Sequence, residues 1–179
     1  MSLIFLDRDG VINRFPGKDR YVTSFSHFSF LPGVKLAVRL LSEAGHELVV
    51  ISNQGGVSRG TITEKKLWLM TRRMLASLER AGGNIRKVFY CTHQTSDACG
   101  CKKPKLGLIR KAVGHRRGLL KKAYFIGDSK EDVETAAGAG CRSILVLSGR
   151  SKKKDIAEKR VNQKPNKTSR QKYQNRRCE

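Results

Sequence analysis

Short apolar runs alternate with stretches of helical periodicity along the first 149 residues of the chain. Five of these runs are rich in residues that favour strands. We expect the strands at Leu3–Leu6, Glu47–Ile51, Val88–Cys91, Ala123–Ile126 and Ser143–Leu147. Strands that alternate with helices pair in parallel through right-handed crossovers, so the pattern predicts an α/β fold with a parallel sheet.

The first predicted helix spans Gly33–Ala44. It follows Pro32, which favours the start of a helix, and it stops before a glycine. Leu36, Leu40 and Leu41 recur at helical spacing, and we expect them on the buried face of this helix.

Three further helices complete the pattern. The longest runs over Thr63–Ala81, with Thr63 as its N-cap and two glycines after its end. Its apolar stripe is a set of core residues: Leu67, Met70, Met74 and Leu78. Shorter helices are predicted over Lys105–Val113 and Lys130–Ala139.

The pattern fades after about Leu147, which divides the chain into a folded domain over 1–149 and a basic tail over 150–179. Lys, Arg, Asn and Gln dominate the tail. Ser151–Val161 is compatible with a solvated helix, and the remainder is predicted to be disordered.

The formal net charge of +22 is extreme for 179 residues. Residues 150–179 hold 12 Lys/Arg and 3 Asp/Glu, a net of +9, which leaves +13 for residues 1–149. Such a field attracts phosphorylated substrates, nucleic acid or acidic membrane surfaces without choosing among them. No apolar run is long enough to span a membrane, and the first run ends at once in charged residues, so we expect a cytoplasmic protein.

Two carboxylates, Asp7 and Asp9, follow the first predicted strand, and Gly10 allows a sharp turn after them. The carboxyl ends of parallel strands are where open α/β sheets bind ligands. Two close carboxylates repel each other, so a divalent cation or a proton-transfer role is the usual reason to hold them together. Alone, this pair also fits an ordinary solvated turn.

Three more strand ends or turns carry matching chemistry. The predicted strand over Glu47–Ile51 is followed by Ser52, Asn53 and Gln54, whose hydroxyl and amides suit an anion cradle. Lys103, held beside a proline, places a positive charge suited to a phosphate. Asp128 follows another strand and completes an oxygen-rich Mg²⁺ site with Asp7 and Asp9.

With these four motifs in order, residues 3–149 resemble the haloacid-dehalogenase-like (HAD-like) phosphohydrolase superfamily. The resemblance implies a Rossmann-like three-layer sandwich and a metal-assisted phosphoryl transfer. Asp7 is then the nucleophile and Asp9 the general acid and base. Mg²⁺ is held by the Asp7 carboxylate, the Asp9 backbone carbonyl and Asp128. Ser52, Asn53 and Lys103 stabilise the transferred group.

A compact cluster of soft ligands precedes Lys103. Its three thiols and one imidazole suit a closed, structural Zn²⁺ site that staples the loop carrying Lys102 and Lys103. The predicted ligands are Cys91, His93, Cys99 and Cys101.

Within the superfamily, such a zinc loop is similar to two branches, the heptose-1,7-bisphosphate 7-phosphatases of lipopolysaccharide synthesis and the histidinol-phosphatases. The segment from Ser52 to Gly60, with Gln54 and Arg59, resembles the heptose branch, whereas the short spacing from His93 to Cys99 resembles the histidinol branch. Arg59 and the basic body favour a sugar bisphosphate as substrate. Lys102 stands where both branches usually carry Arg, which changes recognition of the distal phosphate.

No large cap domain fits between the first two motifs, so the site is expected to be open. The family resemblance implies a monomer. An open, basic site also suits a nucleic-acid end phosphatase. A rival outside enzymology is a nucleic-acid-binding protein on a HAD-like fold, with nonspecific binding through the tail. The intact set of Asp7, Asp9, Lys103 and Asp128 favours an enzyme.

Overall fold

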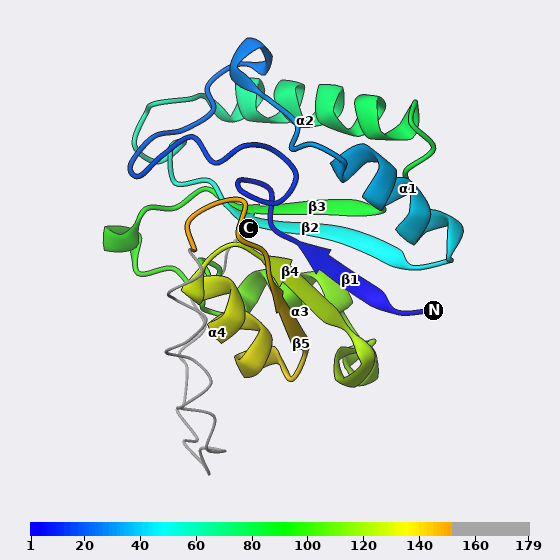
Figure 1. Cartoon of the computed structure of the whole chain (residues 1–179). Helices are drawn as coiled ribbons and strands as arrows, with labels where there is room; N and C mark the ends of the chain where they lie inside the picture. The colour runs from blue at the N-terminus through cyan, green and yellow to red at the C-terminus, as the bar shows by residue number, and fades with distance from the viewer. Residues whose placement is uncertain (152–179) are drawn as a thin grey trace.

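A sheet of five parallel strands in the order β3-β2-β1-β4-β5 forms the centre of the computed structural model, which describes residues 1–151 (Figure 1). Every neighbouring pair of strands is parallel. The strands are β1 (Leu3–Leu6), β2 (Glu47–Asn53), β3 (Lys87–Cys91), β4 (Tyr124–Gly127) and β5 (Arg142–Leu145). The predicted parallel α/β sheet is confirmed, and the strand ends differ from the prediction by at most two residues.

Helices cover both faces of this sheet. Helices α1 and α2 lie on one face and α3 and α4 on the other, which gives the predicted three layers (Figure 1). The helices are α1 (Val34–Glu43), α2 (Glu64–Glu79), α3 (Gly107–Val113) and α4 (Lys130–Ala139). Short 3-10 turns lie at Phe25–His27, Thr95–Asp97 and Arg117–Lys122.

Alternate residues of the central strands serve two separate cores. Leu6 and Val50 pack in the cluster that contains the α2 stripe, while Phe5 and Val49 pack in the cluster under α3. Because both faces of these strands are covered, their sequences are continuously apolar rather than alternating. The predicted α2 stripe of Leu67, Met70, Met74 and Leu78 is buried as expected.

The predicted buried face of α1 is wrong for two of its three residues. Leu36 and Leu40 are 51% and 52% exposed, whereas Val38 is 2% exposed. Val34 and Leu41 pack against the same core cluster as Val38. The spacing i, i+4, i+7 of these three residues forms the stripe that faces the sheet, and Leu36 and Leu40 lie outside it.

The crevice above β1 is the place where the chain changes direction across the sheet. From β1 the chain passes to β2 on one side, whereas β4 pairs with β1 on the other side. Such a switch point is where open α/β sheets bind ligands, beyond the carboxyl ends of the strands. The connection from β1 to α1 holds a single 3-10 turn among its described elements, so this connection contains no large cap domain.

The predicted basic tail, including the helix proposed over Ser151–Val161, lies outside the described residues apart from its first two positions. Within residues 1–151, no helix combines the length and the apolar character needed to cross a membrane.

Candidate active site

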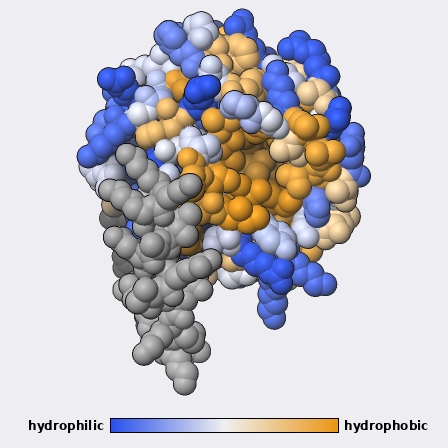
Figure 2. Space-filling model, in the orientation of Figure 1, coloured by the Kyte–Doolittle hydropathy of each residue, from blue (hydrophilic) through white to orange (hydrophobic). Residues whose placement is uncertain are grey.

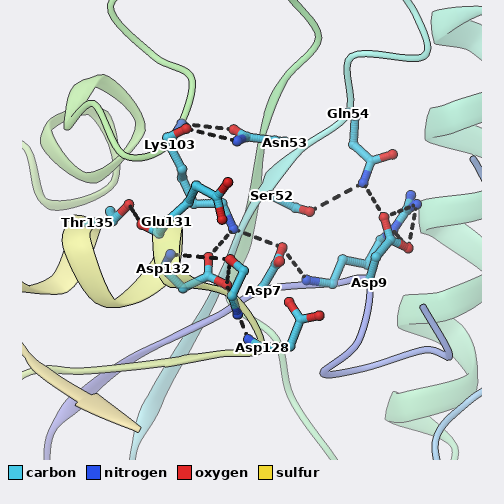
Figure 3. Close-up of polar contacts among 12 residues, drawn as sticks. Asp7, Asp9, Ser52, Asn53, Gln54, Lys103, Asp128, Glu131, Asp132 and Thr135 are labelled. Atoms are coloured by element: carbon cyan, nitrogen blue, oxygen red, sulfur yellow. Dashed lines mark hydrogen bonds and ion pairs between the residues drawn. The ribbon is translucent and has the colours of Figure 1, made fainter. Parts of the chain in front are cut away.

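Asp7 lies at the floor of a small cavity beyond the end of β1. Its side chain accepts a hydrogen bond from the Arg8 backbone N–H at 2.7 Å and pairs with the Lys103 Nζ at 3.0 Å (Figure 3). Burial raises the pKa of Asp7, although the Lys103 charge and a hydrogen bond from Ser52 partly offset this effect. A positive charge close to this carboxylate therefore favours the ionised form that a nucleophile needs.

Lys103 is buried between two carboxylates. Its Nζ lies 2.6 Å from Asp132 Oδ1 as well as 3.0 Å from Asp7 Oδ1. Burial alone would lower the pKa of Lys103, but these two carboxylates outweigh it and raise the pKa. Lys103 is consequently a fixed positive charge at the cavity floor.

Asn53 fixes the backbone of Lys103. Its amide accepts a hydrogen bond from the Lys103 backbone N–H at 2.9 Å and donates one to the Lys103 carbonyl at 3.2 Å (Figure 3). The amide predicted to contact a phosphoryl group thus uses both its oxygen and its nitrogen to hold the backbone of Lys103. Ser52 lies beside it, 1% exposed, in the same cavity lining.

Asp9 is surrounded by donors from three directions. Arg8 donates to both of its oxygens, at 2.9–3.1 Å, and Asn13 and Gln54 each donate at 2.8 Å. Burial would raise the pKa of Asp9, but Arg8 and these hydrogen bonds outweigh burial and lower it. Gln54, predicted to contact substrate, instead bridges Asp9 and Ser52.

Asp128 completes the carboxylate set from the end of β4. Its Oδ2 accepts a hydrogen bond from the Arg150 backbone N–H at 2.7 Å, whereas its buried Oδ1 has no hydrogen-bond partner among residues 1–151. Burial first, and then the negative charge of Asp7, raise the pKa of Asp128 to about 7. A buried carboxylate oxygen without a donor, facing a second carboxylate, fits a hard cation such as Mg²⁺.

Asp132 lies within the same carboxylate group but is saturated by other partners. Carboxylate oxygens of Asp7, Asp128 and Asp132 lie within 4.8 Å of one another. Besides Lys103, Asp132 accepts hydrogen bonds from the backbone N–H of Asp128 and from Ser129, as part of the capping box of α4. We therefore assign a candidate Mg²⁺ to Asp7 and Asp128, and Asp132 to orienting the loop and Lys103.

Two glycines allow the chain to approach Asp128 closely. A Cβ added at Gly10 or at Gly149 would overlap Asp128 Oδ2. Gly10 also has a φ of 89°, a conformation that residues with a Cβ rarely adopt. The segments after β1 and after β5 therefore both lie in close contact with the Asp128 side chain.

The four predicted zinc ligands meet in one cluster. The sulfurs of Cys91 and Cys99 lie 3.6 Å apart, and the Nδ1 of His93 lies 3.3 Å from the sulfur of Cys101. Any two thiolates bound to one tetrahedral zinc through bonds of about 2.3 Å are roughly 3.8 Å apart, close to these separations. The donor set and its spacing fit a closed zinc site.

Two predicted substrate contacts lie away from the cavity. Arg59 stacks over the Tyr21 ring at 5.9 Å and lies 3.8 Å from Asp19. Lys102 donates to Thr95 Oγ1 at 2.8 Å on the zinc loop. Neither residue lines the cavity.

A family model described as HAD-hydrolase-like matches residues 100–170. A D-glycero-beta-D-manno-heptose-1,7-bisphosphate 7-phosphatase from Pseudomonas putida is 36% identical over 153 residues, which cover 86% of this chain and 86% of that protein. The chain belongs to the HAD-like phosphatase family. A protein of the same name from Neisseria meningitidis is also 36% identical, over 86% of this chain and 81% of its own length.

A solved structure agrees with the fold of this HAD-like phosphatase. The D,D-heptose 1,7-bisphosphate phosphatase from Bordetella bronchiseptica superposes with a TM-score of 0.81 at 35% identity. The match covers 88% of this chain and 87% of that one, and that crystal structure contains magnesium and phosphate.

The sequence pattern missed three residues that line the cavity of this phosphatase. Ser129 and Glu131 begin α4 directly after Asp128, so their place near a strand end was visible in the sequence. Arg150 reaches the cavity from the segment after β5. Because the apolar pattern fades just before Arg150, the sequence pattern assigned this residue to the basic tail rather than to the site.

Proposed function

We propose that this HAD-like phosphatase removes the 7-phosphate of heptose 1,7-bisphosphate through an aspartyl-phosphate on Asp7. One observation carries the proposed chemistry: Asp7 and Lys103 pair on the buried floor of the cavity beside Ser52, and a carboxylate oxygen of the buried Asp128 lies within 4.8 Å of one of Asp7. The substrate assignment rests on the names of relatives that match most of the chain.

The first half-reaction belongs to Asp7. One of its oxygens attacks phosphorus while the bond from phosphorus to the sugar oxygen breaks. Lys103 and the Ser52 hydroxyl stabilise the equatorial oxygens, where negative charge gathers in the transition state. Asn53 contributes through Lys103, because its amide fixes the backbone of that lysine.

Asp9 acts in both half-reactions. In the first it gives a proton to the departing sugar oxygen, and in the second it takes a proton from the water that attacks the aspartyl-phosphate. The four donor atoms around Asp9 hold it as an ionised carboxylate, the form that the second half-reaction needs. The first half-reaction needs the protonated form, so some of these donors must release Asp9 when substrate enters.

A bound Mg²⁺ would reduce the repulsion between the Asp7 carboxylate and an anionic phosphoryl group. Asp7, Asp128 and the Asp9 backbone carbonyl are its proposed ligands. The zinc site has a structural role in this proposal, because it holds the loop that ends at Lys103. Its thiolate ligands require reduced cysteines, which favours a cytoplasmic enzyme. We also propose that the enzyme acts as a monomer.

Phosphate release from heptose 1,7-bisphosphate, histidinol phosphate and a phosphate-ended oligonucleotide, each with Mg²⁺, tests this function. Asp7→Asn is the control, since it removes the nucleophile at little change in size. We expect kcat/KM to be highest for the heptose substrate and undetectable in the control. Faster turnover of histidinol phosphate would reject the proposed substrate while keeping the proposed chemistry.

A further inference from the structure

Arg150 lies at the rim of the active-site cavity. The cavity floor consists of buried groups, among them Asp7 and Lys103, each 5% exposed. Arg150 lines the same cavity but is exposed to solvent. Glu131 is the other exposed residue of the described lining, so a substrate whose reacting phosphate lies at the floor passes Arg150, Glu131 or both on its way out to solvent.

The charges around the cavity leave a role for such a residue. Its lining includes the carboxylates of Asp7, Asp9 and Glu131, and only Lys103 and Arg150 supply positive charge among its described residues. Lys103 is committed to two carboxylates. The guanidinium of Arg150 forms no ion pair with any acid in the described part of the chain.

Hydrogen bonds hold the backbone of Arg150 in place. Its N–H donates to Asp128 Oδ2 at 2.7 Å, and the N–H of Ser151 donates to the Asp128 carbonyl at 2.9 Å. Just before it, the Ser148 hydroxyl donates to the Gly10 carbonyl at 2.6 Å. The segment that carries Arg150 is thus tied to the strand ends that build the catalytic floor.

The side chain of Arg150 is also supported. Its guanidinium lies over the ring of Phe15, 5.0 Å from the centroid. Stacking uses the flat face of a guanidinium and leaves its N–H edge available for a two-pronged contact with an oxyanion. A supported cation loses less conformational freedom when it binds an anion than a free surface arginine does.

We propose that Arg150 binds the anionic group at the non-reacting end of the substrate and so selects substrates with two negatively charged ends. This inference rests on the proposed function and deepens it. Arg59 and Lys102, the residues that the sequence suggested for this task, are directed to Tyr21 and Thr95 instead.

The test compares Arg150→Ala and Arg150→Lys with the unchanged chain on heptose 1,7-bisphosphate and heptose 7-phosphate. Arg110→Ala, on the exposed surface of α3 away from the cavity, is the matched control. We expect Arg150→Ala to lower kcat/KM for the bisphosphate by roughly 10- to 100-fold, the range for a charge-assisted contact. The loss of kcat/KM for the monophosphate should be several-fold smaller. On the bisphosphate, the kcat/KM of Arg150→Lys should lie between those of Arg150→Ala and the unchanged chain.

A pair of simple esters separates this inference from the proposed sugar substrate. Phenyl phosphate and 4-carboxyphenyl phosphate differ mainly in a distal negative charge. Arg150→Ala should reduce kcat/KM for the carboxylated ester more than for the plain one, whatever the natural substrate is. Equal losses on both members of both pairs would overturn the role of Arg150. Failure of the unchanged chain to act on the heptose would overturn the proposed function alone.

Discussion

At the scale of single residues, the site depends on buried charges that restrain one another. Arg8 is 1% exposed and holds Asp9 with a two-pronged contact. Its guanidinium also lies 5.8 Å from the centre of the Tyr90 ring, and the Tyr90 hydroxyl is hydrogen-bonded to Thr71. Arg8 is a positioning residue in this arrangement, because it acts through Asp9.

Arg8→Lys keeps the charge but loses the fork that fixes Asp9. We expect a loss of tenfold or more in kcat for an alkyl phosphate, whose leaving oxygen needs the proton from Asp9. The first half-reaction of 4-nitrophenyl phosphate needs no such proton, so its aspartyl-phosphate should form at a rate closer to that of the unchanged chain in a rapid-quench experiment. Equal slowing with both esters would contradict a role through Asp9.

The raised pKa of Asp128 predicts how Mg²⁺ binding depends on pH. A cation binds the ionised carboxylate, and with a pKa of about 7 a proton competes for that site below neutral pH. The increase in Tm on adding Mg²⁺ should therefore be larger at pH 8 than at pH 6. Asp128→Asn should abolish the increase at both values, and a shift independent of pH would be evidence against this carboxylate as ligand.

Gly149→Ala tests the close approach to Asp128. The added Cβ would overlap Asp128 Oδ2, so the carboxylate must move, and Mg²⁺ affinity measured by calorimetry should fall tenfold or more. Gly118→Ala is the matched control, because nothing lies within 4 Å of the Cβ added there. Similar affinities in the two variants would count against the predicted displacement.

At the scale of elements, the loop with the four proposed zinc ligands links the segment after β2, which carries Ser58, to Lys103 in the cavity. Besides its metal ligands, the loop is fastened by Asp97, which accepts a hydrogen bond from the Ser58 hydroxyl at 2.9 Å. Lys105 donates to the carbonyls of Ala98 and Cys99. The loop ends at Lys103, so its order contributes to the position of this lysine, together with the hydrogen bonds between the lysine backbone and Asn53.

Cys99→Ser should lower zinc content, thermal stability and kcat together, because one of the three thiolates among the four proposed ligands is lost. Zinc is measured by atomic emission, and hydrogen exchange over residues 92–102 reports the order of the loop. Cys141→Ser is the control, since this thiol lies outside the cluster. Full activity in a zinc-free Cys99→Ser protein would reject the stapling role.

The sequence predicted where the strands and helices lie better than which side of each helix is buried. The strand runs, the α2 stripe and the four motifs depend on local pattern. The structure confirms the strands and the stripe, and it brings Asp7, Lys103 and Asp128 of the motifs close together. The face of α1 depends on how the preceding loop orients the helix, which no local pattern specifies. The amide partners of Asn53 and Gln54, and the reach of Arg150, likewise result from contacts between segments far apart in the chain.

At the scale of the whole molecule, the sheet extends beyond helices α1 and α2 on the face that these two helices cover. Figure 2 shows a broad hydrophobic area on the side toward the viewer, around the strands labelled β1, β4 and β5 in Figure 1. Ile144 of β5 is 44% exposed, and it pairs with Ile126, which packs at the border of the α1–α2 core. This apolar area contrasts with a chain of net charge +22.

The basic C-terminal residues predict nonspecific binding of nucleic acid. The full chain should shift a DNA or RNA duplex at low salt, and the shift should weaken steeply as salt rises, because bound phosphates release counterions. A chain ending at residue 151 should lose the shift while its kcat on the sugar phosphate is maintained. Binding that persists in the shortened chain would assign it to the folded body.

The zinc cluster has a consequence for the environment in which the enzyme works. Three of its four ligands are sulfurs that an oxidant such as hydrogen peroxide would attack, with loss of the metal. Release of the loop would then remove one of the restraints on Lys103 without any change to Asp7 or Asp9. With zinc bound as proposed, oxidation would therefore lower the activity of this phosphatase, and thiol reduction with fresh zinc would restore it.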